Sequence, residues 1–318
     1  MKKIISLNLS LVLLLLCGCA ANQENSDTRF MLDTVVTLTA TCNSETLDGA
    51  FLLCQDYEKM LSRTIEGSDT YNLNTSNGFV EVNEHTKNII ERSVYYGDLS
   101  NGKFDITIYP VSSLWDFNGE VIPSHNEIAE ALKNVDYQSI EINKNNINLN
   151  GKQIDLGGIA KGYIADRLLE YFKQNNTPEG IIDLGGNIIV WGKRDYTIGI
   201  KKPFSNGDLA AKIKINNKTV VTSGTYERYI PTSIKIYHHI LDPETGYACE
   251  SNLSSATIIG NSSFDADALS TLCILVGLEK AKEIIENTPD TEAVFIDTDG
   301  NLHYTTGLSL NNQIFTLK

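Results

Sequence analysis

The sequence Asp-Leu-Gly-Gly occurs twice, at Asp155–Gly158 and Asp183–Gly186, and this doubled motif constrains the fold more than any other feature. The first copy continues into Lys161 and a helical pattern of apolar residues. Glycines before a helix let backbone amides approach an anion, and the helix N-terminus adds partial positive charge. The first copy therefore predicts a phosphate-binding loop, to which Lys161 adds a full charge. The alternative is that both copies are tight turns that close strands.

Composition narrows the function classes. Neither copy matches the dinucleotide fingerprint or the Walker loop, so the common nucleotide-binding folds are not indicated. The 318 residues are 42% hydrophobic and 21% charged, which is typical of a globular protein. The net charge of −14 argues against a nucleic-acid partner, which needs a basic face. An acidic protein that handles a polyanion needs a metal ion to offset the repulsion.

The N-terminus is typical of a bacterial lipoprotein. Two lysines precede an apolar stretch that ends in Leu16-Cys17-Gly18-Cys19. This order indicates a secretory signal at residues 1–18 rather than a membrane span. It predicts lipidation of the Cys19 thiol, a cell-membrane location on the extracytoplasmic face, and a polar tether at residues 19–29. The alternative is an ordinary signal peptide that is cleaved nearby.

The other cysteines are Cys42, Cys54, Cys249 and Cys273. They allow more than one disulfide pairing. Buried free thiols are equally compatible with the sequence, because Cys54 and Cys273 lie on apolar faces of helical patterns.

Periodicity predicts a mixture of helices and short strands in residues 30–318, which we expect to form a single domain. Strands occur in runs rather than alternating strictly with helices, which favours an α+β fold with largely antiparallel sheets and packed helices. Ser124 followed by Glu127 is a capping-box signature for a helix that runs to about Lys133. Further helices are predicted over 47–61, 86–99, 264–276 and 279–286. Strands are predicted over 34–41, 139–142, 147–149, 180–184, 188–191, 197–201, 211–215, 219–222, 234–241, 293–296 and 302–304.

Asp267 and Thr271 lie one helical turn apart, with Ser270 beside them. A carboxylate and a hydroxyl so placed supply two oxygen ligands to a hard cation such as Mg²⁺, whose shell is completed by water and phosphate. The structural alternative is that Asp265 caps the helix and Thr271 bonds back to its own backbone.

His238 and His239 end an apolar strand and are followed by a turn at Asp242–Gly246. A histidine at a strand end in a cleft is suited to general-base catalysis near neutral pH, although a lone histidine is more often structural. Two further segments, Ser223–Arg228 and Leu114–Phe117, are compatible either with ligand contacts or with ordinary turns and aromatic core packing.

In this order, the motifs resemble the FAD:protein FMN transferase (ApbE-type flavin transferase) family, whose members are often lipoproteins. The resemblance implies an α+β fold related to the tunnelling fold. It also implies cleavage of FAD, transfer of FMN through a phosphoester bond to a Ser or Thr hydroxyl of a target protein, and release of AMP. The motifs that carry the resemblance span nearly the whole mature chain: 30–34, 102–105, 114–117, 155–162, 183–187, 223–228, 239–246 and 267–271.

The resemblance also implies roles for individual residues. It places Mg²⁺ between the Asp267 carboxylate, the Thr271 hydroxyl and a backbone carbonyl of the first glycine loop, at Gly158, with Ser270 at a third metal-side position. His239 is expected to assist deprotonation of the acceptor hydroxyl. The residues expected to contact FAD are Met31, Tyr71, Ser112, Ser113, Leu114, Asp155, Lys161 and Leu241.

Two departures from the family pattern bear on activity. Thr225 stands where the family commonly has Asp, and Ser270 stands where Asp is frequent. Loss of carboxylates near the site can weaken metal binding or favour plain hydrolysis. An FAD pyrophosphatase and a non-catalytic flavin-binding lipoprotein therefore remain alternatives to the transferase. The expected partners are FAD, an extracytoplasmic acceptor with a Ser/Thr flavinylation motif, and the membrane through a lipid anchor.

Overall fold

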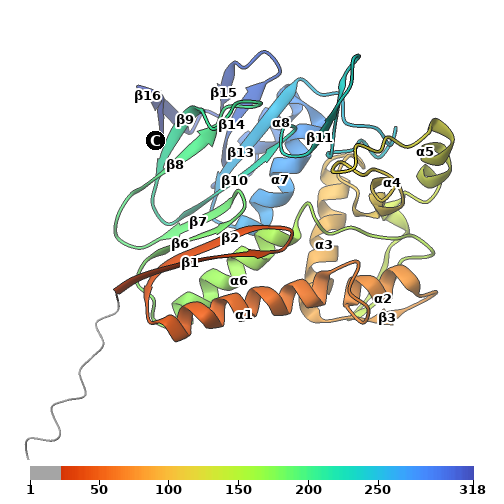
Figure 1. Cartoon of the computed structure of the whole chain (residues 1–318), viewed down its shortest axis with the longest axis horizontal. Helices are drawn as coiled ribbons and strands as arrows, with labels where there is room; N and C mark the ends of the chain where they lie inside the picture. The colour runs from red at the N-terminus through yellow and green to blue at the C-terminus, as the bar shows by residue number, and fades with distance from the viewer. Residues whose placement is uncertain (1–22) are drawn as a thin grey trace, which may run out of the picture.

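The computed structural model describes residues 23–318 (Figure 1), so the predicted signal at 1–18 and Cys19 lie outside the described residues. The centre of the fold is an eight-stranded sheet whose neighbouring strands are all antiparallel. This sheet confirms the predicted α+β class. In spatial order its strands are β1 (Gln23–Met31), β2 (Thr34–Cys42), β6 (Gly180–Leu184), β7 (Asn187–Trp191), β10 (Lys218–Gly224), β13 (Leu253–Gly260), β14 (Glu292–Asp297) and β15 (Leu302–Tyr304).

Helices pack on one face of the central sheet and a smaller sheet packs on the other. The main helices are α1 (Ser44–Leu61), α6 (Ala160–Gln174) and α7 (Ser263–Val276). Figure 1 shows α1 and α6 below β1 and β2, and α7 beside β10 and β13. Because both faces are covered, β13 is buried along its whole length. The smaller sheet comprises β16 (Leu308–Asn311), β17 (Ile314–Leu317), β9 (Leu209–Ile215) and β8 (Tyr196–Lys201).

The remaining elements surround one end of the central sheet. Short strands form a three-stranded sheet and a separate hairpin. An aromatic cluster around Trp115 joins the hairpin to the neighbouring helices. These elements are α2 (Asp69–Thr75), β3 (Val80–Glu81), α3 (Glu84–Leu99), α4 (Tyr109–Ser112), α5 (His125–Leu132), β4 (Glu141–Asn143), β5 (Asn146–Asn148), β11 (Tyr229–Pro231) and β12 (Ile236–His238). The last helix, α8 (Leu278–Glu286), lies apart from them and packs on α7 and β14.

The helices predicted from periodicity are confirmed, with starts fixed by capping side chains. The Asn43 side chain caps α1, and both bonds of the Ser124–Glu127 capping box are present at the start of α5. The sequence reasoning missed α2 and the central strand β13. The strand predicted over 234–241 is shorter in the structure, because β12 ends at His238.

The prediction of a polar tether at residues 19–29 is wrong for residues 23–29, the part that the structure describes. Residues from Gln23 onward form β1, an edge strand paired with β2 along its whole length. Hydroxyl pairs stabilise it across the strands, with Ser26 Oγ 2.7 Å from Thr39 Oγ1 and Thr28 Oγ1 3.0 Å from Thr37 Oγ1. A polar composition therefore suits a solvent-facing edge strand as well as a tether.

The four cysteines of the described residues, Cys42, Cys54, Cys249 and Cys273, are free thiols, and all of them are buried. Burial raises the pKa of the Cys54 thiol to about 12, with a smaller contribution from Glu58, which keeps the thiol protonated and unreactive. Across residues 23–318, no helix is both long enough and apolar enough to cross a membrane.

Helices α6 and α7 cap each other. The N-cap residue of α6, Ile159, offers no side-chain hydrogen bond. The buried carboxylate of Asp267 on α7 accepts the Gly162 N–H at 2.8 Å instead. In the opposite direction, Asp166 on α6 accepts the backbone N–H groups of Ser263 and Phe264, each at 3.0 Å. The two helices are therefore fixed relative to each other at their first turns.

Gly162 makes this close approach possible, so Gly162→Ala tests it. A Cβ there would lie 2.1 Å from the Ser263 carbonyl oxygen and 2.6 Å from the Asp267 Cβ. We expect the substitution to lower the free energy of unfolding by about 1–3 kcal/mol in chemical denaturation. Gly260→Ala is the control, because its nearest neighbour would lie 3.8 Å away, in ordinary contact. Equal stability of the two variants would contradict this account.

Candidate functional site

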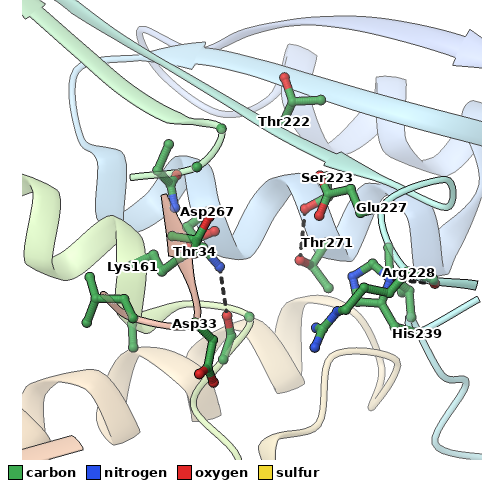
Figure 2. A pocket seen from close by; sticks show the side chains of 18 of the residues that line it. Asp33, Thr34, Lys161, Thr222, Ser223, Glu227, Arg228, His239, Asp267 and Thr271 are labelled. Carbon is green, nitrogen blue, oxygen red and sulfur yellow. Dashed lines mark hydrogen bonds between the residues drawn. The ribbon is translucent and has the colours of Figure 1, made fainter. Parts of the chain in front are cut away.

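A cavity of ≈ 1190 Å³ opens where the β1–β2 and β6–β7 turns meet the first turn of α6, the middle of α7 and the end of β12. Figure 2 shows residues from these segments converging on it. Of the residues expected at the site, the lining includes Ser112, Asp155, Gly158, Lys161, His239, Leu241, Asp267 and Thr271.

The two Asp-Leu-Gly-Gly copies have different structures. The first precedes α6, and its Asp155 carboxylate accepts the Gly157 N–H at 2.9 Å and pairs with Arg63 at 3.2 Å. The second forms the β6–β7 turn, where Gly185 and Gly186 have φ of 68° and 103°. The first copy is thus a loop before a helix, as predicted, and the second is a tight strand-closing turn.

The predicted metal-side residues Gly158, Asp267 and Thr271 lie close together. Gly158 faces Thr271, because a Cβ on that glycine would be 3.8 Å from the Thr271 Cγ2. The Thr271 hydroxyl lies 3.2 Å from the Ser223 hydroxyl. The structural alternative, in which Asp265 caps the helix, does not hold. Ser262 caps α7, and Asp265 pairs with Arg92.

Ser270 is placed behind this group rather than in the cavity. It is fully buried, donates to the Asp267 carbonyl at 2.8 Å, and lies 2.7 Å from the Ser223 Oγ. It therefore positions Ser223 and α7 and does not face a ligand directly. Thr225, the second departure from the family pattern, is also buried and bonds to the Ser254 carbonyl through both its N–H and its hydroxyl.

Several residues expected to contact FAD do not line the cavity. Met31 pairs with Thr34 at the base of the β1–β2 turn, and the lining there begins at Leu32 and continues to Val35. Tyr71 lies on α2, away from the lining. Ser113 is exposed and Leu114 packs against the Trp115 cluster, so of this segment only Ser112 reaches the cavity.

His239 lies in the wall opposite Lys161, just after β12 (Figure 2). Its Nδ1 is 3.3 Å from the Arg228 carbonyl oxygen. Because a carbonyl only accepts, Nδ1 carries the proton and Nε2 keeps a free lone pair. Burial lowers the pKa of His239 to about 3, and the positive charges of Arg228 and Lys161 act in the same direction. The ring is therefore neutral at physiological pH and able to accept a proton.

Glu227 is a cavity residue that the sequence reasoning missed. It follows β10 within the Ser223–Arg228 segment and lies beside Ser223 in Figure 2. Desolvation within the cavity raises its pKa and Asp267 adds to this effect, whereas Lys161, Arg228 and Lys201 oppose it. The signal available in the sequence was a carboxylate inside a segment that was already singled out.

The neutral state of His239 is open to a direct test by NMR. We expect its ring signals not to titrate between about pH 5 and 8, because the pKa lies well below that range. Arg228→Gln is expected to raise this pKa toward the ordinary value, since one of the repelling charges is removed while burial remains. The exposed His125 gives an internal reference signal. A midpoint near the ordinary value in the unmutated protein would contradict the assignment.

Comparisons with known proteins agree with this geometry. The family model described as the ApbE family matches residues 32–295. An FAD:protein FMN transferase from Klebsiella pneumoniae (strain 342) is 34% identical over 255 residues, which cover 77% of this chain and 80% of that protein. One from Treponema pallidum (strain Nichols) is 29% identical over 288 residues, 82% of this chain and 80% of that protein.

Solved structures give the same result. The crystal structure of the ApbE protein from Thermotoga maritima superposes with a TM-score of 0.82 at 30% identity and covers 89% of this chain and 97% of its own. The apo flavinyl transferase ApbE of Pseudomonas stutzeri, at 22% identity, has the same fold with a TM-score of 0.79. The sequence match, the architecture and the cavity together show that this chain belongs to the ApbE family.

Proposed function

We propose that this chain is an FAD:protein FMN transferase that moves FMN from FAD to a Ser or Thr hydroxyl of a target protein and releases AMP. The observation that carries the proposal is a single cavity with the Asp267–Thr271 oxygens and Lys161 on one side and a neutral histidine on the other. The acceptor oxygen forms a bond to the FMN phosphorus. The bond from that phosphorus to the bridging oxygen breaks, and AMP leaves with the bridging oxygen.

The donor set in the cavity fits Mg²⁺. It consists of one buried carboxylate, Asp267, the Thr271 hydroxyl and the Gly158 backbone, all of which are hard oxygen donors. Within residues 23–318, no group of three or more His, Cys, Asp or Glu side chains forms a metal site. A site with one carboxylate suits an ion whose shell is completed by substrate phosphate. When bound, Mg²⁺ would neutralise charge on the diphosphate.

The chain's own residues then position the reacting groups. Lys161 and the positive end of the α6 dipole attract the diphosphate, and a charge-assisted hydrogen bond from Lys161 to phosphate is strong. His239 Nε2 takes the proton of the acceptor hydroxyl. A bound diphosphate raises the pKa of His239, because its negative charge offsets the repulsion by Arg228 and Lys161.

The two alternatives to the transferase are an FAD pyrophosphatase and a non-catalytic flavin-binding protein. An FAD pyrophosphatase would use water in place of the protein hydroxyl, and Thr225 was the feature that motivated it. Because Thr225 is buried against Ser254 and is not among the cavity-lining residues, it gives this alternative no support. A non-catalytic flavin-binding protein would have no use for a neutral histidine opposite the phosphate side.

We also propose that the chain is a lipoprotein, anchored through Cys19 on the extracytoplasmic face of the cell membrane. The support is the sequence order of two lysines, an apolar stretch and Leu16-Cys17-Gly18-Cys19. The acceptor would then be an extracytoplasmic protein with a Ser/Thr flavinylation motif.

The transferase is tested by mixing the protein with FAD, Mg²⁺ and a candidate acceptor and measuring acceptor fluorescence after denaturation. Asp267→Asn keeps an oxygen for the Gly162 N–H but removes the charge, so we expect transfer to fall about 100-fold or more. Mn²⁺ binding followed by electron paramagnetic resonance is expected to weaken in parallel. Asp183→Asn, in the other glycine motif, is the control. Release of FMN and AMP without covalent flavin in any acceptor would favour the pyrophosphatase.

The two glycine motifs predict different mutational effects on FAD affinity. Lys161→Ala is expected to weaken FAD binding about tenfold, because it removes a charge-assisted contact to phosphate. Asp183→Ala is expected to leave it nearly unchanged, because that carboxylate accepts the Gly186 N–H at 3.1 Å within a turn. Quenching of FAD fluorescence measures both. Equal effects would contradict the division of roles.

A further inference from the structure

We propose that an apolar rim beside the cavity docks the acceptor polypeptide, and that it selects a segment with a large apolar side chain near the modified Ser or Thr and acidic rather than basic flanks. This inference rests on the proposed transferase function. The rim consists of five exposed apolar residues from the β8–β9 loop, the start of β9 and the β11–β12 hairpin: Phe204, Leu209, Tyr229, Ile234 and Ile236.

The two segments that carry the rim meet through their aromatic side chains. The Phe204 ring centroid lies 5.4 Å from that of Tyr229 and 6.1 Å from that of Tyr226, so the loop and the hairpin are in contact. Ile234, at the hairpin turn, is 92% exposed, and Phe204 is 50% exposed. Phe204 also has a left-handed backbone with φ of 54°, which is unfavourable for an aromatic residue. Gathered apolar exposure of this kind marks an interaction site.

The rim is continuous with the cavity on the side of the proposed base. Lys202, Ser205 and Asp208 of the β8–β9 loop line the cavity, and so does Tyr226. His239 directly follows β12, and its backbone N–H donates to the Arg228 carbonyl at 3.1 Å. The hairpin that presents the rim therefore also holds the base. A segment bound on the rim places its hydroxyl close to His239.

The charges beside the rim indicate that the partner segment is acidic rather than basic. Lys201, Lys202 and Arg228 flank the rim, and among residues 23–318 none of them is in an ion pair. These three cations outnumber the two carboxylates beside them, Asp208 and Glu227. They form a basic border on a chain whose net charge is −14. Such a border attracts acidic segments and repels basic ones over about the Debye length.

An array of 12-residue peptides, each with one central serine, tests this inference with FAD and Mg²⁺ present. Flanking positions carry Phe or Ala together with Asp or Lys, and bound flavin is read as fluorescence after denaturing washes. We expect the unmutated protein to label Phe/Asp peptides about tenfold better than Ala/Lys peptides. The variant with Phe204→Ser and Ile234→Ser is expected to lose the preference for Phe while its FAD affinity stays unchanged.

The matched control is Leu52→Ser on α1, which removes a 60% exposed apolar side chain that does not line the cavity. It should label the array like the unmutated protein. Labelling without any preference for Phe would contradict the docking role of the rim, and so would a preference for Phe that survives in the double variant. Either result would leave the proposed transferase function intact. Failure of the unmutated protein to label any peptide would count against the transferase and the rim together.

Discussion

The reciprocal capping of α6 and α7 is the interaction on which the site depends. Asp267 satisfies the Gly162 N–H, and Asp166 satisfies the first turn of α7. A carboxylate that is 4% exposed is costly to bury without such a partner. The dipole at the N-terminus of α6 helps to offset this cost. One structural bond therefore holds a charged oxygen donor in the cavity wall, on the same side as Lys161.

This arrangement separates two electrostatic tasks. In the proposed transferase, the Asp267 side of the cavity would hold a cation and a diphosphate, whereas His239 would have to stay uncharged until a hydroxyl arrives. Burial keeps the histidine neutral in the absence of ligand, and the positive charges of Arg228 and Lys161 add to this effect. In the proposed transferase, the same charges would attract the diphosphate, whose binding would raise the basicity of the ring. Substrate binding and base activation would thereby be coupled.

Patterns with a local physical cause could be predicted from the sequence. The capping box at Ser124, the loop before α6, and Asp267 with Thr271 on one helix face all depend on residues a turn or two apart. The tether prediction was wrong because the polar strand β1 is stabilised by pairing with β2, and local composition does not encode that pairing. β13 was missed because a strand buried on both faces has no alternation. Met31 and Tyr71 lie outside the cavity lining, because turns and short helices set which neighbour faces the cavity.

If Cys19 carries a lipid, as proposed, the edge strand β1 would also limit where the enzyme can work. Only three residues separate Cys19 from Gln23, and the nine residues of β1 then run straight to the turn that lines the cavity. At about 3.4 Å per residue, the strand adds about 30 Å to a leader of about 14 Å. With a lipid on Cys19, the catalytic cavity would therefore be held within about 45 Å of the bilayer surface. Acceptors would have to present their hydroxyl inside that layer, so membrane proximity would itself become a filter on which proteins are modified.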